Sequence, residues 1–386
     1  MTAVRAYLDY NASAPLLRAA REAVVAALDA ANPSSVHGEG RAARRIIEEA
    51  RRQVAALANA QPQHVVFTSG ATEGAMTLLT PEWRMGKAAL RFSRLYVCTA
   101  DHPCLLGGGR FPADRVTQIG VDRDGLLKLD ELAAALAAHD REQGLALVAV
   151  HAANNESGVV QPLEEIASIV KTAGGVLVLD TVQAAGRVPL DMSRPCADYL
   201  ILSAHKIGGP KGVGAIVAAA DLMMPVPLVG GGGQEKGHRG GTENLPGIAG
   251  FGAAAAAALE GLRSIDEVRK MRDRFEAAVL ELLPDAVIFG RAAPRLANTS
   301  FFAASGLKAE TAQIAFDLAG VALSAGSACS SGKVGASHVL TAMGFDEIQG
   351  ALRVSIGQAT DTQDLELFRS ALAGIVSRSA AGGRAA

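Results

Sequence analysis

Cysteine is scarce in this sequence, and no two cysteines have metal-binding spacing. The 386 residues contain four, and none belongs to a CxxC pair: Cys98, Cys104, Cys196 and Cys329. A zinc site, any other resident metal or a framework of disulfide bonds is therefore not expected. So few cysteines are typical of the reducing cytoplasm, and we predict a cytoplasmic location.

An excess of charge of either sign is also missing. Lys and Arg total 37 and Asp and Glu total 39, which gives a net charge of −2. Without a dominant basic face or tail, we expect neither nucleic acid nor a membrane surface as partner. The N-terminus has no apolar signal region. The most apolar stretch, Leu245–Leu259, is shorter than the roughly 20 residues of a membrane span and is expected to form a core helix.

Apolar residues, in contrast, make up 49% of the chain and charged residues only 20%. This balance excludes a disordered chain and allows a sizeable buried core. The length suggests two domains, or one large one, at about 100–200 residues per domain. The 42 glycines are more than usual and cluster, which indicates loops where the backbone approaches something closely.

Short apolar runs alternate with helix-like segments through the middle of the chain. Continuous apolar strands separated by helices predict an α/β fold with a mainly parallel sheet covered on both faces. The six runs of strand length are Val65–Thr68, Leu95–Cys98, Leu145–Val150, Val176–Leu179, Tyr199–Leu202 and Ala215–Val217.

Beyond about Gly261 the pattern changes and predicts a smaller α+β domain. Strands are expected at Asn298–Phe302 and Leu352–Ile356, and helices at Arg263–Leu283, Glu310–Leu318 and Asp364–Val376. We predict a large domain over residues 16–260 and a small domain formed by residues 1–15 and 261–386.

Polar residues follow four of the apolar runs, at the strand ends where open α/β sheets bind ligands. Ser69 and Gly70 open a predicted helix, whose free N–H groups suit a phosphate. Neither a Walker loop nor a GxGxxG dinucleotide fingerprint is present. The remaining strand ends carry Asn154, Asn155, Asp180, Ser203, His205 and Lys206.

These groups are chemically complementary. A lysine directly after a strand, beside a phosphate cup, suits a Schiff base, and an aspartate at the neighbouring strand end could keep a pyridine nitrogen protonated. Together, Lys206, Asp180 and the phosphate cup describe a site for pyridoxal phosphate.

At this point the chain resembles the cysteine desulfurases of the NifS/IscS-like type, fold-type I pyridoxal-phosphate enzymes of the class V aminotransferase group. The resemblance covers nearly the whole chain and implies a large domain with a mainly parallel seven-stranded sheet. The motifs that carry it, in order, are YLDYNASAP (Tyr7–Pro15), NPSSVHGEGRAAR (Asn32–Arg44), FTSGATEG (Phe67–Gly74), NNESGVVQP (Asn154–Pro162), LDTVQAAG (Leu179–Gly186), SAHKIGGPKGVG (Ser203–Gly214), GGGQEKGHRGGTEN (Gly231–Asn244), SAGSACSSGKVGASHVL (Ser324–Leu340) and LRVSIG (Leu352–Gly357).

The resemblance implies a role for each cofactor-site residue. Lys206 would carry the Schiff base, Asp180 would pair with the pyridine nitrogen, and Gln183 and Asn155 would contact the phenolic oxygen or neighbouring ring substituents. The competing interpretations are structural: a surface lysine, a helix N-cap and buried loop-capping amides. The residues expected to hold the phosphate are Ala71, Thr72, Ser203 and His205, with Thr242 supplied across a dimer interface.

The resemblance also implies the catalytic and substrate-binding residues. His102 would stack on the ring and transfer protons, and Arg353, with Asn155, would bind the substrate, because an arginine fork matches a carboxylate. Cys329 lies in a Gly/Ser loop and would accept the sulfur as a persulfide. Whether Cys329 also contacts an iron–sulfur cluster transiently is left open.

The implied activity is conversion of L-cysteine to L-alanine by a homodimeric sulfurtransferase that passes sulfur to an acceptor protein for iron–sulfur clusters or another sulfur-containing cofactor. The alternatives are a selenocysteine lyase, a related class V aminotransferase-like enzyme, or a non-catalytic sulfur-assembly partner that keeps the fold. Three departures from the family pattern stand out: Asp101 where Glu is common, Gly74-Ala75-Met76 after the phosphate segment, and a tail that differs from scaffold-docking members.

Overall fold

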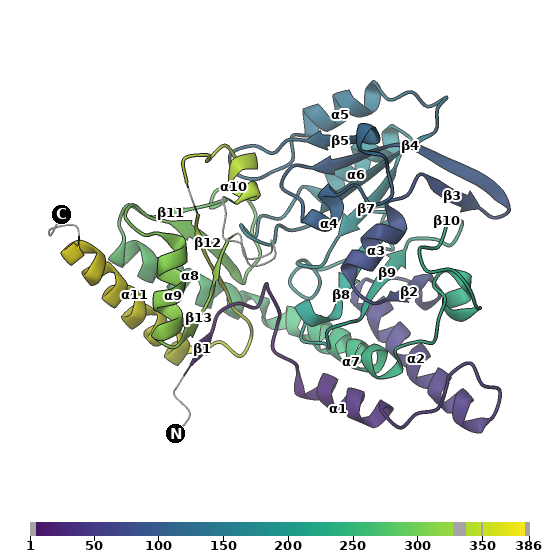
Figure 1. Cartoon of the computed structure of the whole chain (residues 1–386), viewed down its shortest axis with the longest axis horizontal. Coiled ribbons are helices and arrows are strands. Elements are labelled where there is room, and N and C mark those ends of the chain that lie inside the picture. The colour runs from purple at the N-terminus through teal and green to yellow at the C-terminus, as the bar shows by residue number, and fades with distance from the viewer. Residues whose placement is uncertain (1–4, 327–336, 349, 383–386) are drawn as a thin grey trace.

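The structure, a computed structural model, describes residues 5–326, 337–348 and 350–382 of the chain. Two lobes lie side by side, one built on a large sheet and the other on a small one (Figure 1). The N-terminal segment crosses from the small lobe to helix α1 beneath the large lobe (Figure 1).

The large sheet has the order β10-β3-β4-β6-β7-β8-β9-β2, with β5 paired to β4. Pairing is parallel from β5 through β4, β6 and β7 to β8, which confirms the α/β class and the mainly parallel sheet. It has nine strands rather than seven, because β3 and β10 extend the β4 edge as antiparallel strands. The strands are β2 (Val65–Thr68), β3 (Glu82–Met85), β4 (Ala88–Cys98), β5 (Val116–Ile119), β6 (Leu145–His151), β7 (Val176–Asp180), β8 (Tyr199–Ser203), β9 (Gly214–Ala218) and β10 (Met223–Pro225).

Both faces of this sheet are covered, as the continuous apolar strands predicted. Alternate residues of β7, for example, enter different cores: Val176 and Val178 join one, Leu177 and Leu179 the other. Every residue of β6 after the first, and every residue of β7, β8 and β9, is buried. The helices of this lobe are α1 (Arg18–Ala27), α2 (Gly38–Leu57), α3 (Ala71–Leu78), α4 (Pro103–Leu106), α5 (Leu129–Ala137), α6 (Leu163–Thr172) and α7 (Leu245–Gly261).

Helix α7 is the core helix that the alanine- and glycine-rich stretch predicted. With the following helix it forms one helical segment, Leu245–Leu282, in which one 18-residue window is apolar enough, by length and composition alone, to cross a membrane. Half of that window is buried inside the protein. A Cβ at Gly252 would lie 2.6 Å from the Ala50 Cα of α2. Glycine at this position therefore allows the two helix backbones to pack closely.

The small sheet is antiparallel, in the order β11-β12-β15-β14. A separate parallel pair joins β1 (Ala6–Tyr7) to β13 (Val321–Ala322), so the N-terminus shares the core of the small lobe. Its other elements are α8 (Ile265–Leu282), β11 (Val287–Ile288), β12 (Thr299–Ala303), α9 (Ala309–Leu318), β14 (Ser324–Ala325), α10 (His338–Ala342), β15 (Leu352–Ser355) and α11 (Thr362–Gly382). Short 3-10 helices are η1 (Pro62–His64), η2 (Ala113–Arg115), η3 (Ala204–Lys206), η4 (Gln234–Gly237) and η5 (Leu262–Ser264).

Candidate functional site

A cavity of about 510 Å³ lies at the ends of strands β2, β6, β7 and β8. Nine of the residues singled out from the sequence line it: Ala71, Thr72, His102, Asn155, Asp180, Gln183, Ser203, His205 and Lys206. The parallel sheet brings them together because the carboxyl ends of neighbouring strands share one edge.

The N-terminus of α3 forms one wall of the cavity. Ala71 and Thr72 are its first residues, so their backbone N–H groups have no partner within the helix and are available to a phosphate. A Cβ at Gly214 of β9 would lie 2.8 Å from Gly70, which explains why glycine stands beside this turn. Gly74, Ala75 and Met76 do not line the cavity, so this departure from the family pattern leaves the wall intact.

Lys206 reaches into the cavity from η3, directly after β8. Its amine donates to the backbone carbonyls of Asn11 (2.6 Å) and Ala12 (3.0 Å). Its neighbour His205 lies 3.1 Å from the hydroxyl of Ser13. Burial and the charges of Lys206 and Lys211 lower the pKa of His205 to about 4, so the imidazole is neutral and interacts through hydrogen bonds.

Asp180 ends β7 as a buried carboxylate at the cavity wall. Its Oδ1 accepts the N–H of Val182 at 2.9 Å. Burial, opposed by that hydrogen bond and reinforced by the charge of Asp101, raises the pKa of Asp180 to about 6. A protonated pyridine nitrogen would supply the opposite charge. The carboxylate, the lysine amine and the phosphate cradle thus fit pyridoxal phosphate.

We expect the cofactor-free Asp180→Asn variant to be more stable than the cofactor-free parent at neutral pH. Because folding raises this pKa from about 3.8 to about 6, the native chain holds a proton that the unfolded chain has lost. The parent therefore loses folding stability as the pH rises from about 3.8 to about 6, by at most about 3 kcal/mol. Urea unfolding of both proteins between pH 4 and 8 measures the difference. A difference that does not change with pH would contradict the assignment.

His102 is the N-cap of α4, and its orientation is set by the backbone. Its Nδ1 accepts the N–H of Cys104 at 3.2 Å, so the proton of the neutral ring lies on Nε2. Burial, with the charges of Lys206 and His338, lowers the pKa of His102. The neutral imidazole can then donate or accept a proton in the cavity.

Two arginines lie behind the cavity wall. The Arg187 guanidinium bonds to the Gln183 side-chain oxygen, which leaves the Gln183 amide nitrogen to donate to the Asn11 carbonyl at 3.0 Å. Arg353 is fully buried and does not line the cavity. It donates to the Asn155 carbonyl (2.9 Å) and pairs with Asp9 (2.7 Å), while its Nε has no partner. Because Arg353 and this donor are buried behind the cavity wall, the anchoring of a substrate carboxylate by Arg353 stays a prediction.

Thr242 lies outside the cofactor cavity. It is exposed and lines a separate hollow of about 110 Å³ that shares Ser69 and Gly212 with the main cavity. Within one chain, the structure thus does not bring Thr242 together with the other predicted phosphate ligands.

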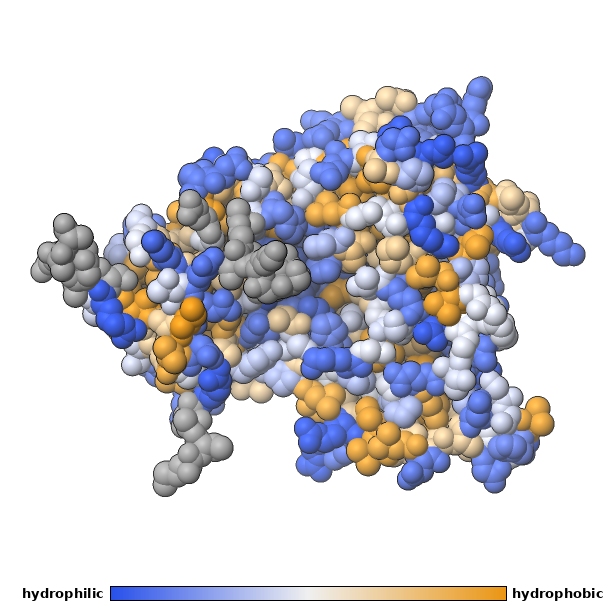
Figure 2. Space-filling view, viewed as in Figure 1, coloured by the Kyte–Doolittle hydropathy of each residue, from blue (hydrophilic) through white to orange (hydrophobic). Residues whose placement is uncertain are grey.

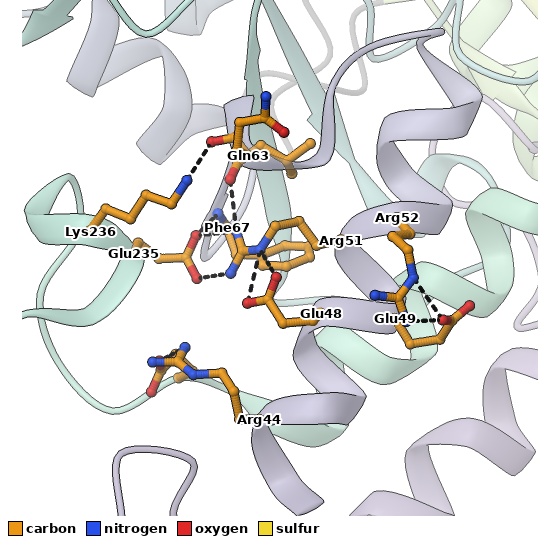
Figure 3. A network of polar contacts seen from close by, with 11 residues as sticks. Arg44, Glu48, Glu49, Arg51, Arg52, Gln63, Phe67, Glu235 and Lys236 are labelled. Carbon is orange, nitrogen blue, oxygen red and sulfur yellow. Dashed lines mark hydrogen bonds and ion pairs between the residues drawn. The ribbon is translucent and has the colours of Figure 1, made fainter. Parts of the chain in front are cut away.

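Three guanidinium–carboxylate pairs hold the loop that carries Thr242. Arg51 of α2 makes two bonds of 2.8 Å to Glu235, and both side chains are buried (Figure 3). The other two pairs are Arg44 with Glu243 and Arg239 with Glu73. Breaking one partner of a buried pair costs about 3–5 kcal/mol, so the loop is firmly attached to α2 and α3.

Glu73 connects this loop to the phosphate wall. Its Oε2 accepts the N–H of Ser69 at 2.8 Å, and its Oε1 accepts from Arg239 at 3.0 Å. Burial raises the pKa of Glu73, but the hydrogen bonds from Arg239 and Ser69 outweigh it and lower the pKa. Glu73 therefore remains ionised at neutral pH.

Cys329 lies outside the described residues, so its role as sulfur acceptor stays a prediction, and only the other three thiols can be described. Burial raises the pKa of each of the other three cysteines, which keeps them as weakly nucleophilic thiols. Cys104 lines the cavity, Cys98 is buried at the end of β4, and Cys196 donates to the Asp191 carbonyl.

Sequence reasoning missed several residues of the site. His151, Glu73, Cys104, Lys211 and Ser13 also line the cavity. The signal for His151 was available, since it ends the apolar run of β6 beside Asp180. Asn11 belongs to the motif YLDYNASAP (Tyr7–Pro15), but the sequence pattern assigned it no role. It is buried and bonds to Thr299 of the small lobe and to the Asn155 carbonyl, which explains how the N-terminal segment joins both lobes.

Comparison with known proteins agrees with this geometry. Residues 6–368 match the family described as aminotransferase class-V. A cysteine desulfurase of Frankia sp. (strain EuIK1) is 40% identical over 96% of this chain and 91% of its own. One from Cereibacter sphaeroides is 39% identical over 96% of both chains. The solved structure of a NifS-like protein from Rickettsia africae superimposes with a TM-score of 0.85 at 30% identity, over 97% of this chain and all of the other.

Proposed function

This chain belongs to the aminotransferase class-V family and is a cysteine desulfurase, and from that premise we propose that it converts L-cysteine to L-alanine with pyridoxal phosphate and carries the sulfur on Cys329. The observation that carries the proposal is the convergence of the Lys206 amine, the Asp180 carboxylate and the N-terminus of α3 on one cavity. Pyridoxal phosphate, when bound, supplies the electron sink for the charge left by removal of the substrate's α-proton.

The residues of the chain would position the substrate and move its protons. The carbonyls of Asn11 and Ala12 hold the Lys206 amine at the cavity wall, where it can take the α-proton. Neutral His102 can deliver a proton from Nε2. Asp180 holds negative charge at the place where a pyridine nitrogen would need it, and Arg353 would bind the α-carboxylate of the substrate.

Sulfur transfer would use Cys329. Its thiolate would attack the sulfur of the substrate, and the Cβ–S bond would break with its electron pair going to Cβ, which takes up a proton to give alanine. The new S–S bond would leave the sulfur on Cys329 as a persulfide. The thiolate is the reactive form, so this step requires that Cys329 lose its proton. The three cysteines of the described chain retain theirs, which supports the assignment to Cys329.

Purified protein incubated with L-cysteine and a thiol reductant should give alanine and sulfide in equal amounts. Cofactor binding should be visible as the absorbance band of a pyridoxal Schiff base. A selenocysteine lyase would release selenide from selenocysteine but little sulfide, and an aminotransferase would give pyruvate-type products instead of alanine. A protein that binds no cofactor would instead be a non-catalytic assembly partner, and the proposal would be wrong.

The acceptor side of the reaction extends the same proposal. We infer a cytoplasmic homodimer that passes sulfur to an acceptor protein for iron–sulfur clusters or another sulfur-containing cofactor. Exposed apolar side chains around α1 support an interface there, since apolar patches of this kind mark contact surfaces (Figure 2). They are Leu16, Leu17, Val25, Leu28 and Val36, the last 89% exposed.

If Thr242 completes the partner's phosphate site, two defective variants should repair each other. A mixed dimer of Lys206→Ala and Thr242→Ala chains would hold one complete site, made from Lys206 of one chain and Thr242 of the other. Co-refolding the two variants should then give desulfurase activity above the mean of the separate proteins. Activity equal to that mean would place Thr242 in its own chain's site, and a fully active monomer in light scattering would refute the dimer.

A further inference from the structure

A buried acid–histidine pair lies beside the cofactor site. Strands β4, β6 and β7 are neighbours in the sheet, and their ends carry Asp101, His151 and Asp180. His151 and Asp180 are paired in the β6–β7 register, and Asp101 lies three residues beyond the end of β4. Asp101 is completely buried and His151 is 3% exposed.

Three donors converge on the Asp101 carboxylate. Its Oδ2 accepts the N–H of Cys98 at 2.7 Å, and its Oδ1 accepts the backbone N–H of His151 at 2.8 Å. The Nδ1 atom of His151 lies 2.6 Å from the same Oδ1. Both oxygens act as acceptors, which is the behaviour of an ionised carboxylate, and they join the end of β4 to the end of β6.

Gln161 determines which nitrogen of His151 carries the proton. Its Oε1 accepts the N–H of Leu127, and its Nε2 donates to the carbonyl of Gly125, each at 2.9 Å. The amide is thereby oriented so that Nε2 also donates to His151 Nε2 at 3.0 Å. His151 Nε2 must accept, so the proton lies on Nδ1 and points to Asp101. The imidazole is neutral and leaves the charge of Asp101 uncompensated.

The position of Asp101 connects this pair to the cavity. It precedes His102, and its backbone carbonyl faces His338 Nε2 at 2.9 Å. We propose that Asp101, held by His151 and Gln161, is a positioning residue of the cofactor site that fixes the backbone carrying His102 and places a second negative charge behind Asp180. The inference rests on the proposed function for the identity of the ring that Asp180 would meet.

The electrostatics of neighbouring groups support the proposal. Burial and then the negative charge of Asp101 raise the pKa of Asp180. Burial and the charges of Asp180 and Asp101 raise the pKa of Cys104. A negative charge at this place stabilises a protonated pyridine nitrogen. Cys98, Asp101 and His151 are close enough to suggest a metal site, but both nitrogens of His151 are already engaged, so no metal is assigned.

The test compares Asp101→Asn, which removes the charge, with Asp101→Glu, which keeps it. Two readouts are independent of Cys329: the ¹⁵N shift of the ring nitrogen in protein loaded with ¹⁵N-labelled pyridoxal phosphate, and exchange of the α-proton of L-alanine with D₂O. Asp101→Asn should move the ring nitrogen toward its neutral shift and slow exchange by about tenfold or more, the effect of one pKa unit. Asp101→Glu should restore most of both.

His139→Gln is the matched control, because His139 bonds to Tyr96 and Gly144 away from the cavity, and it should change neither readout. Wild-type shift and exchange in folded Asp101→Asn would overturn the inference. If that variant does not fold, ¹⁵N-histidine spectra of the wild type decide: the neutral ring of His151 should carry its proton on Nδ1. The Nε2–H tautomer would overturn it. Absence of exchange in the wild type would instead contradict the proposed function.

Discussion

Cys329→Ser is expected to bind pyridoxal phosphate and L-cysteine normally and to form no persulfide. In the proposed site, cofactor and substrate binding use Lys206, Asp180 and the α3 N-terminus, and the chemistry of these groups needs no thiol. A serine hydroxyl is not ionised near neutral pH and is a poor nucleophile toward sulfur, so persulfide formation should fall below detection. The measurement is a single turnover with ³⁵S-labelled cysteine, followed by mass spectrometry of the peptides.

The other cysteines provide the controls for this experiment. Cys98→Ala, Cys104→Ala and Cys196→Ala should keep the activity, because burial raises the pKa of each thiol. Cys104 is the most demanding of them, since it lines the cavity and its N–H orients His102. That bond comes from the backbone, so it should survive the change to alanine. Label on any of these three cysteines, or wild-type alanine formation by Cys329→Ser, would refute the persulfide mechanism.

Lys206→Ala is expected to lose the visible band of the bound cofactor and all measurable desulfurase activity while remaining folded. The amine is both the proposed attachment point for the cofactor and the proposed base, and loss of proton transfer alone costs about 10²–10⁴-fold. The fold should persist because the Asn11 carbonyl that Lys206 contacts also accepts from Gln183. Absorbance, alanine formation and circular dichroism measure the three properties.

Lys211 offers a matched control for this change. It is an exposed lysine that also lines the cavity, five residues further along the chain. Lys211→Ala removes one positive charge near the phosphate cradle, so it should weaken cofactor affinity and keep the visible band at saturation. Loss of the band in Lys211→Ala but not in Lys206→Ala would show that the attachment point has been misassigned.

The elements that position the site were predictable from local sequence. Apolar runs such as Val176–Leu179 coincide with strands of the sheet, because a strand buried on both faces needs apolar residues in succession. The short strands β3 and β10 were missed because their sequences are not distinctive, and β10 joins the sheet only through β3, about 140 residues earlier in the chain. Lys206, Asp180 and Thr72 were recognisable because each lies at the end of a predicted element: Asp180 ends β7, Lys206 follows the end of β8 by three residues, and Thr72 is the second residue of α3.

The sequence by itself determined the central strands of the sheet, the order of the motifs and the chemical groups at the strand ends, because these follow from short-range pattern and residue type. Only the tertiary structure decided the partners of those groups. It paired Arg353 with Asp9, left Thr242 outside its own chain's cavity, and joined Asp101 to His151 and Gln161. Such partners lie 10 to 344 residues apart, and a hydrogen bond between them depends on packing to within a few tenths of an ångström, which no local pattern encodes.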